Sequence, residues 1–233
     1  MIPIVIPTNN RPDYLIKVLV ALFKCENLDK FKVMTFEEPN SDVSSLLDNF
    51  GLLDIERHHN PSHLGCTKNI HCALTSGFNQ FDKVVVLEDD IIPAPDFLNY
   101  FLWAFDIYEN SNDVLGICSY QMHKEKPASD LINRTDVSRM FNPWGWGTWL
   151  NRFNRMDNSG IFRREEKSWD CLLAEHFYFG QYNLFIKPVV GRTQNIGEHG
   201  TYVPSPEWQR ANQHTPFWAG DGSFPIINEN SFV

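Results

Sequence analysis

The sequence lacks the features that mark several common classes of protein. No run of apolar residues approaches the roughly 20 that a membrane-spanning helix needs. The apolar start at residues 2–7 is too short for a secretory signal and has no cationic residues before it. The five cysteines include no Cys-x-x-Cys pair, so neither a zinc ribbon nor a disulfide framework is indicated. We therefore expect a cytoplasmic protein with free thiols and no membrane span.

Basic residues are also scarce. Lys and Arg number 20 against 29 Asp and Glu, which gives a formal net charge of −9. Because nucleic-acid binding relies on clustered Lys and Arg that neutralise phosphates, we predict no nucleic-acid partner. The hydrophobic share of 42% and the charged share of 21% are ordinary for a globular protein. With 233 residues and no internal repeat, the chain suits one domain over 1–233.

Aromatic residues, by contrast, are plentiful, with 18 Phe, 7 Trp and 7 Tyr. Three tryptophans, Trp144, Trp146 and Trp149, alternate with Gly145 and Gly147 in one short stretch. This stretch has two interpretations. Either the glycines let the backbone approach a ligand while the indole faces stack on a sugar, or the rings fill the hydrophobic core.

Strand and helix patterns alternate through the first 120 residues. Short apolar and β-branched runs predict strands at 3–7, 31–36, 55–59, 83–87 and 114–120. The segments between them predict helices at 12–24, 43–50, 67–78 and 95–108. This alternation predicts an α/β protein with a mostly parallel, Rossmann-like sheet and helices on both faces.

The pattern changes after about residue 120. Residues 121–139 are polar and loop-like, and 140–149 are rich in aromatic residues and glycine. One more helix is predicted at 165–179 and one more strand at 184–188. We therefore expect a nucleotide-binding first half, followed by a second half with long loops that contact a second substrate.

Three consecutive acids, Glu88, Asp89 and Asp90, follow the most apolar of the predicted strands. Ligands of open parallel sheets bind outside the carboxyl ends of the strands. Carboxylate oxygens there suit Mg²⁺ or Mn²⁺, and a divalent ion can bridge a diphosphate. The triplet therefore indicates a nucleotide–metal site, although a solvated acidic loop before the next helix is the plainer alternative.

Five segments, in the same order along the chain, resemble a known family. They are PIVIPTNNRPDYL (3–15), TKNIHCAL (67–74), VVVLEDDIIPAPDFLNYF (84–101), SWDCLL (168–173) and IKPVVGRTQNIGEHG (186–200). They resemble N-acetylglucosaminyltransferase I and its relatives, which are inverting, nucleotide-sugar-dependent glycosyltransferases of the GT-A fold. The WGWGTW stretch at 144–149 resembles a signature of microbial surface-glycan glycosyltransferases.

The resemblance implies a GT-A fold in which residues 1–120 bind the nucleotide sugar and residues 121–233 bind the acceptor and carry the catalytic group. The chain departs from the family at two positions. Asn69 stands where the family has a histidine near the donor, and Glu37 stands where it has an aspartate that contacts uracil. The family enzyme is also longer, with a membrane anchor and stem that we do not find. These departures affect the identity of the sugar more than the reaction class.

The resemblance assigns roles to individual residues. Asp90 matches the direct metal ligand for Mn²⁺ or Mg²⁺, and His199 in the closing loop is the candidate that completes the coordination. The donor would be held by residues from both halves: Arg11, Glu37, Lys68, Asn69, Glu88, Asp89, Trp146, Arg192, Gly197 and Gly200. For most of these, an ordinary surface or core position is the alternative. Glycines at 197 and 200 would let the loop fold over the donor.

Asp170 is the candidate general base. Inverting transfer needs a carboxylate that takes the proton of the acceptor hydroxyl as it attacks C1, and this base must lie within hydrogen-bonding reach. Trp169 beside it could raise its basicity by excluding water. Glu166 is the alternative base, and a solvated helix face is the structural alternative for Asp170.

The sequence therefore predicts a metal-dependent inverting glycosyltransferase that moves a sugar from a nucleoside-diphosphate sugar, UDP-sugar being favoured, to a glycan or other hydroxyl acceptor. A catalytically inactive sugar- or nucleotide-binding module is one alternative. A sugar nucleotidylyltransferase is another, although it would need a glycine-rich phosphate loop where residues 8–12 read Thr-Asn-Asn-Arg-Pro. The sugar, the acceptor and the oligomeric state stay open.

Overall fold

The computed structural model describes residues 1–121, 131, 134–164, 167–178, 184–198, 205 and 207. The strands are β1 (Ile2–Thr8), β2 (Phe31–Glu37), β3 (Ile55–His59), β4 (Lys83–Val86), β5 (Ile91–Pro93), β6 (Val114–Cys118), β7 (Thr135–Ser138), β8 (Trp146–Trp149), β9 (Leu184–Pro188) and β10 (Thr193–Asn195). The helices are α1 (Pro12–Phe23), α2 (Ser41–Asn49), α3 (Cys66–Phe78), α4 (Phe97–Ile107), α5 (Leu150–Asn158) and α6 (Trp169–Tyr178). Short 3₁₀ turns lie at η1 (Leu28–Lys30) and η3 (Ile161–Arg163).

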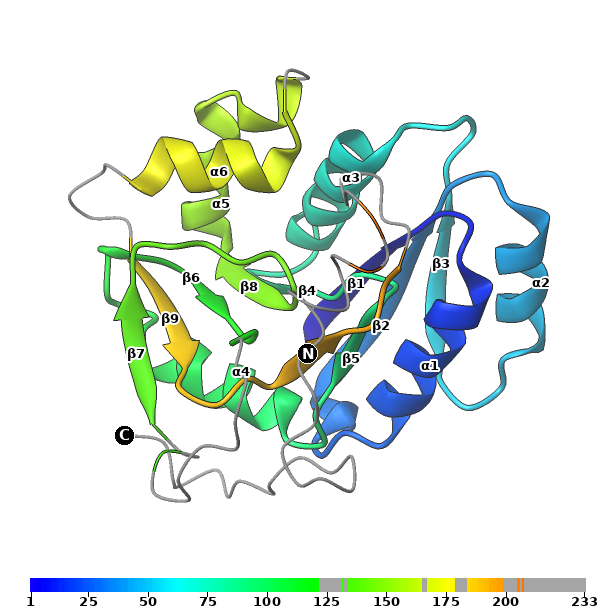
Figure 1. Ribbon diagram of the computed structural model, residues 1–233, viewed down its shortest axis with the longest axis horizontal. Helices are drawn as coiled ribbons and strands as arrows, with labels where there is room; N and C mark the ends of the chain where they lie inside the picture. The colour runs from blue at the N-terminus through cyan, green and yellow to red at the C-terminus, as the bar shows by residue number, and fades with distance from the viewer. Residues whose placement is uncertain are drawn as a thin grey trace.

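A mixed sheet runs through the molecule, and within the described residues it has eight strands in the order β3-β2-β1-β4-β8-β6-β9-β7 (Figure 1). Strands β3, β2, β1 and β4 are parallel neighbours, and β6 and β9 are also parallel. Only β8 and β7 run against their neighbours in this sheet. A two-stranded antiparallel pair, β5 with β10, lies apart from it. The prediction of a mostly parallel sheet is confirmed.

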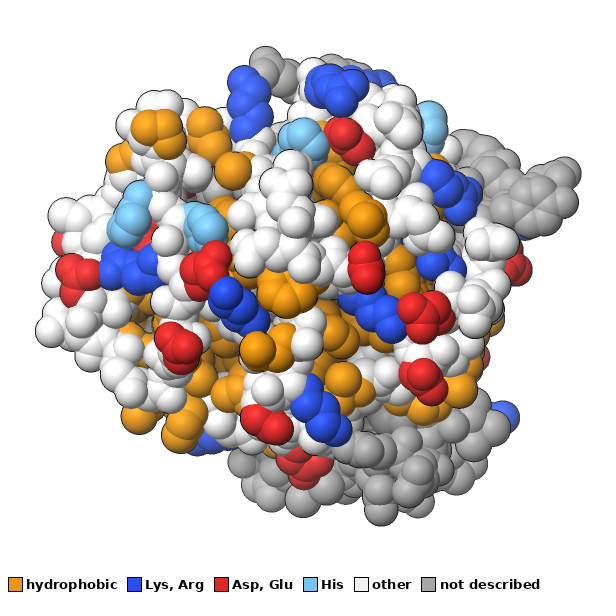
Figure 2. Space-filling view, turned by 180° about the vertical axis from the view of Figure 1, so that it is seen from behind, with side chains coloured by type: hydrophobic (Ala, Val, Ile, Leu, Met, Phe, Trp, Pro, Cys, Tyr) orange, Lys and Arg blue, Asp and Glu red, His pale blue; other side chains and the backbone are white. Residues whose placement is uncertain are grey.

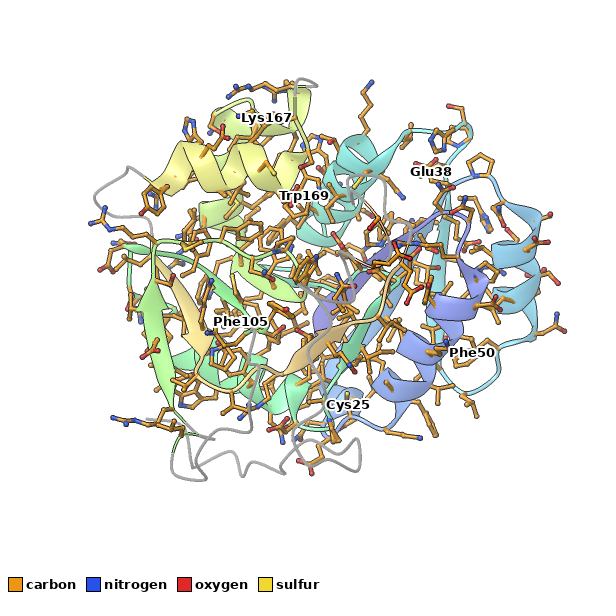
Figure 3. All side chains as sticks on the ribbon, in the orientation of Figure 1. Cys25, Glu38, Phe50, Phe105, Lys167 and Trp169 are labelled. Atoms are coloured by element: carbon orange, nitrogen blue, oxygen red, sulfur yellow. The ribbon has the colours of Figure 1, made fainter. Side chains whose placement is uncertain are left out.

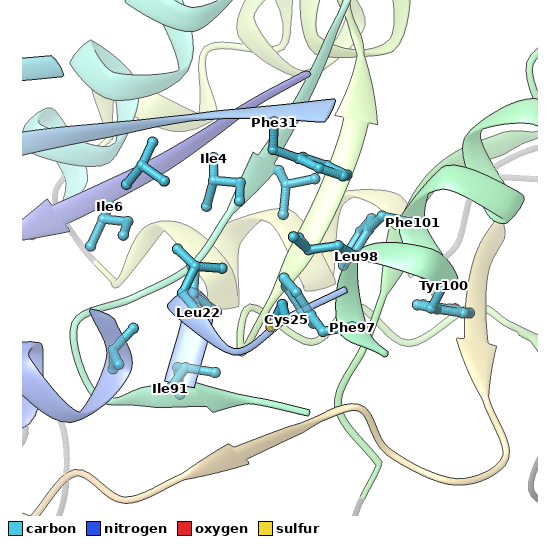
Figure 4. Close-up of a cluster of buried hydrophobic side chains, with 14 of the residues drawn as sticks. Ile4, Ile6, Leu22, Cys25, Phe31, Ile91, Phe97, Leu98, Tyr100 and Phe101 are labelled. Atoms are coloured by element: carbon cyan, nitrogen blue, oxygen red, sulfur yellow. The ribbon is translucent and has the colours of Figure 1, made fainter. Parts of the chain in front are cut away.

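Helices cover both faces of the sheet because successive side chains of a strand point to opposite faces. Ile4 and Ile6 of β1 pack with buried residues of α1, α2 and α4, while Val5 between them packs with α3, α5 and α6. Figure 4 shows part of the first cluster, where Ile4 and Ile6 face Leu22 and Phe97. The prediction of helices on both faces is therefore confirmed.

Local signals explain where these helices begin. Pro12 occupies the first turn of α1, where its missing N–H costs nothing. The side chain of Asn40 caps α2 by accepting hydrogen bonds from the backbone N–H groups of Asp42 and Val43, both at 3.0 Å. The predicted strands at 55–59 and 184–188 have the bounds that the structure shows.

The tryptophan- and glycine-rich stretch follows the second of its two interpretations, in which it belongs to the core. Residues 146–149 form β8, which lies between β4 and β6 in the sheet. A Cβ on Gly147 would come within 2.9 Å of the rings of Phe101 and Phe105. The glycine therefore lets α4 pack closely on the sheet and serves the core.

Periodicity also missed four shorter elements, β5, β7, β10 and α5. Three of these are strands of three or four residues, too short to show an alternation of apolar and polar side chains. No described helix is long and apolar enough to cross a membrane. On the face seen in Figure 2, acidic and basic side chains are interspersed among uncharged ones.

Candidate active site

The candidate site lies at the carboxyl ends of β1 and β4, which are adjacent parallel strands. A cleft of about 440 Å³ opens there. Its walls are residues 7–11 after β1, the start of α3, and the side chains of Glu38, His63, Glu88 and Asp89. The edge of the sheet where ligands of parallel α/β folds bind is therefore hollowed in this protein.

Arg11 ties the end of β1 to the acids after β4. One guanidinium nitrogen lies 2.5 Å from Oδ1 of Asp89, and the other lies 2.6 Å from Oδ2 of Asp90. The Thr8 hydroxyl adds a 3.0 Å hydrogen bond to Asp89. Burial lowers the pKa of Arg11, but the charges of Asp89, Asp90 and Glu88 outweigh it and raise that pKa above its ordinary value.

The acidic triplet carries more negative charge than Arg11 compensates. Burial raises the pKa of Asp89 to about 6, against the opposing charge of Arg11. Burial and the charges of Asp90, Asp170 and Asp89 raise the pKa of Glu88 well above its ordinary value. Carboxylates whose ionised form is this costly favour a bound cation, because a cation lowers the cost of ionising them.

A segment from the end of the described chain closes over Asp90. Strand β10 pairs with β5, and the backbone N–H of Ile196 donates to the Asp90 carbonyl at 2.9 Å. A Cβ on Gly197 would overlap Oδ2 of Asp90. Gly197 therefore lies against the acidic triplet, where a residue with a Cβ would not fit.

Arg192 anchors this closing segment from inside the protein. Its guanidinium Nε lies 3.0 Å from Oδ2 of Asp96, and both side chains are 0% exposed. Burial raises the pKa of Asp96 to about 6 although Arg192 opposes the shift. Arg192 was predicted to bind the donor, but the structure buries it in an ion pair away from the cleft.

Asp170 lies in the first turn of α6 and is half-buried. Its charge raises the pKa of Glu88 and also that of Cys66, so it lies near the cleft that these residues line. Burial is the main cause that raises the pKa of the Cys66 thiol to about 12, while a hydrogen bond from the Trp169 side chain opposes it. Figure 3 shows Trp169 between α6 and α3. The predicted base is thus near Glu88 and Cys66, although it does not itself line the cleft.

Glu38 is a cleft residue that sequence reasoning missed. Its carboxylate is 2% exposed and accepts backbone hydrogen bonds from Leu64, at 2.8 and 3.1 Å, and from Gly65 at 2.9 Å. It thereby fixes the loop that leads into α3 (Figure 3). Its neighbour Glu37, predicted to contact the base, instead forms two 2.8 Å contacts with Arg57 and does not line the cleft. Glu37 is the last residue of β2 and Glu38 is the next, so the sequence prediction chose the wrong one of two adjacent acids.

Other predicted donor residues have mixed outcomes. Asn69 lines the cleft, held by the Phe36 carbonyl at 3.1 Å. Lys68 is exposed and lines a smaller adjoining cleft of about 180 Å³ with Lys167. Trp146 is 0% exposed and packs against Trp169 in the core rather than at the cleft. His199, Gly200 and the alternative base Glu166 lie outside the described residues.

The acidic triplet fits a divalent cation held partly by other ligands. Oδ1 of Asp90 is buried and has no hydrogen-bond partner within the part of the chain that the structure describes. Among the described residues there is no group of three His, Cys, Asp or Glu side chains that could hold a metal alone. Mg²⁺ commonly binds through one or two carboxylates together with substrate phosphates. A metal here would therefore take Asp90 as its protein ligand.

Comparison with known proteins starts from sequence. No protein-family model matches the chain. The chain is similar to the alpha-1,3-mannosyl-glycoprotein 2-beta-N-acetylglucosaminyltransferase of Arabidopsis thaliana, with 27% identity over 124 residues. That match covers 53% of this chain and 27% of the plant protein, so it spans only about a quarter of the relative.

Solved structures define the fold. The chain is similar to TarS 1–349 of S. aureus in complex with UDP, with a TM-score of 0.56 and 13% identity over 80% of this chain and 60% of that one. It is also similar to the galactosyltransferase LgtC in complex with donor and acceptor sugar analogues, with a TM-score of 0.52 and 15% identity over 79% and 73% of the two chains. The fold is that of the GT-A glycosyltransferases.

Proposed function

We propose that this protein is a glycosyltransferase that moves a sugar from a nucleoside-diphosphate sugar to a hydroxyl group of a glycan acceptor. One observation supports this most: Arg11 contacts the carboxylates of Asp89 and Asp90, and Arg11, Glu88 and Asp89 line a cleft at the carboxyl edge of a GT-A sheet. A sugar nucleotide needs both charges, because its hydroxyls donate to carboxylates and its diphosphate accepts from a guanidinium.

The closing segment and the acids suit the donor. Asp89 and Glu88 would accept hydrogen bonds from ribose and sugar hydroxyls, and Asp90 would bind the cation. A divalent cation bound there would neutralise charge that develops on the diphosphate leaving group. UDP is the favoured nucleotide, supported by the curated relative's N-acetylglucosaminyltransferase name and by UDP in the complex of TarS.

Asp170 would act on the acceptor. As the acceptor oxygen forms its bond to C1, Asp170 takes the hydroxyl proton, and the bond from C1 to the diphosphate oxygen breaks on the opposite side. The product is an inverted glycosidic bond together with a free nucleoside diphosphate. The influence of the Asp170 charge on Glu88 and Cys66, which line the cleft, supports this role.

The test is a donor screen with the whole protein. Thermal shift and donor hydrolysis are measured for UDP-, GDP- and dTDP-sugars with Mn²⁺, Mg²⁺ or EDTA. We expect one nucleotide to raise the melting temperature, since a ligand that binds only the folded state stabilises it. The same nucleotide sugar should be hydrolysed slowly when the cation is present.

Two controls make the screen decisive. Asp90→Asn keeps the shape of the side chain and should remove the cation-dependent shift, whereas Asp29→Asn, at an exposed position in η1, should leave it unchanged. Binding of a nucleotide sugar without hydrolysis, and without transfer to any sugar acceptor, would identify an inactive binding module. No shift with any nucleotide would contradict the proposed function.

A further inference from the structure

The proposed function does not explain why Arg11 contacts two carboxylates at once. Its side chain is 28% exposed, and its two terminal nitrogens contact two different carboxylates, of Asp89 and Asp90, at 2.5 and 2.6 Å. Among the described residues that line the cleft, Arg11 is the only lysine or arginine. It therefore supplies the cationic charge at the place where the acids would also meet a metal.

We propose that Arg11 is an internal counter-ion that the divalent cation must displace from Asp90, and that the displaced guanidinium then binds the diphosphate of the donor. The first part concerns the chain's own residues, and the second rests on the proposed function. Arg11 would thus couple cation binding to nucleotide binding.

Geometry at Asp90 supports the displacement. Arg11 contacts Oδ2 of Asp90, and Gly197 lies against the same oxygen, whereas Oδ1 is buried and has no hydrogen-bond partner among the described residues. A cation at Asp90 therefore lies within a few ångströms of the guanidinium. Two positive charges at that distance in a partly buried cleft repel each other strongly, because the surrounding medium screens them less than water does.

The position of Arg11 in the chain permits the movement. Arg11 precedes the first turn of α1, and no capping hydrogen bond is made by its side chain. Its guanidinium lies 5.9 Å from the ring centre of Tyr14, so an aromatic face is within reach when the carboxylates are released. A guanidinium matches two phosphate oxygens at once, which explains how a released Arg11 would hold a diphosphate.

The test removes the guanidinium charge of Arg11 and measures how the binding of Mn²⁺ and of UDP changes. Mn²⁺ binding is measured by titration calorimetry and by electron paramagnetic resonance of free Mn²⁺, without nucleotide, for the wild type and for Arg11→Gln. We expect Arg11→Gln to bind Mn²⁺ about 10-fold more tightly, because the competing charge is gone. We expect the same variant to bind UDP in saturating Mn²⁺ about 10-fold more weakly. Arg163→Gln, at a 66% exposed side chain outside the cleft, is the matched control and should change neither.

A second measurement does not depend on the variant. The side-chain Nε–H resonance of Arg11 should shift when Mg²⁺ is added to the wild type, and shift again, in a different direction, when UDP follows. Equal or weaker Mn²⁺ binding by a folded Arg11→Gln, or an Arg11 resonance that Mg²⁺ does not move, would overturn the exchange while leaving the proposed function intact. A wild type that binds no nucleoside diphosphate with any cation would overturn the proposed function, and the release of Arg11 to a diphosphate would fall with it.

Discussion

Two arginines pair with aspartates close to β5 in the sequence: Arg11 with Asp89 and Asp90 before the strand, and Arg192 with Asp96 after it. The two sites differ in their exposure to solvent. Arg11 pairs with Asp89 and Asp90 at the cleft, with a side chain 28% exposed, whereas Arg192 pairs with Asp96 where both are 0% exposed. We propose that a ligand opens the first pair, whereas the second is buried and does not line the cleft. Both arginines were predicted to bind the donor from their motifs alone. The comparison shows that a motif does not reveal whether its arginine is exposed at the cleft or buried in the core.

The largest expected effect concerns Asp90, one of the two acids that pair with Arg11. Asp90→Ala should abolish cation-dependent donor binding, and transfer with it, because it removes the proposed metal ligand, whose Oδ1 is buried and has no hydrogen-bond partner among the described residues. Its melting temperature without ligand should stay near that of the wild type, since the variant also removes a buried charge. Donor titrations with and without Mn²⁺ measure this. Transfer at a near wild-type rate would show that the pair of Arg11 and Asp90 is structural after all.

The predicted base should have the next largest effect. Asp170→Asn keeps the side-chain shape and removes the proton acceptor, so transfer should fall by about 10²–10⁴-fold. The loss should appear in kcat and not in the KM for the donor, because the interaction develops in the transition state. Glu175→Gln on the exposed side of the same helix is the control. A loss confined to the donor KM would place Asp170 with the donor-binding acids.

Breaking the buried pair of Arg192 and Asp96 should lower the free energy of unfolding. Arg192→Met leaves Asp96 buried without a partner, which typically costs about 3–5 kcal/mol in the free energy of unfolding. Urea denaturation measures the loss. Adding Asp96→Asn to Arg192→Met should recover part of it, because the uncompensated charge is gone. If Arg192→Met were as stable as the wild type yet unable to bind donor, Arg192 would be the donor-binding arginine and its pair with Asp96 would not be structural.

The smallest effect is a difference in pH dependence. The pKa of Asp89 is about 6 in the folded protein and near 3.8 in the unfolded chain. A raised carboxyl pKa favours the folded state fully below pH 3.8, and this contribution is lost as the pH rises through 6. It amounts to roughly 3 kcal/mol for two pKa units. Asp89→Asn should therefore lose less stability than the wild type between pH 4 and 7 in EDTA. Parallel stability curves would contradict this assignment.

The sequence predicted the first half of the fold better than the second, for a physical reason. In the first half each strand is followed by a helix whose apolar spacing is visible, as in the run Leu15, Val18, Leu19 and Leu22. Strand β8 has only four residues and contains Gly147, so its place in the sheet depends on partners 28 to 66 residues away in the sequence, in β6 and β4. Periodicity is a local signal and cannot show such pairing.

The candidate site was predictable where a residue's neighbours in the sequence fix its place. Asp89 and Asp90 lie in the short segment between β4 and β5, and Arg11 lies shortly after β1, so the parallel pairing of β1 and β4 brings them together. Glu37 and Trp146 were misplaced because burial, which decides between a core and a cleft position, depends on distant segments. Glu37 is covered through Arg57 of β3, and Trp146 through Trp169 of α6.

The central position of β8 also bears on how the chain folds. Until residue 149 has been made, β4 is an edge strand with unpaired backbone groups, and the aromatic rings of Phe101 and Phe105 lack their contact with Gly147 of β8. Edge strands with apolar surroundings are prone to pair with other chains. Closure of the β4–β8 pair is therefore a long-range, late event, and ribosome-bound nascent chains that end before β8 should recruit chaperones more strongly than those that have passed it.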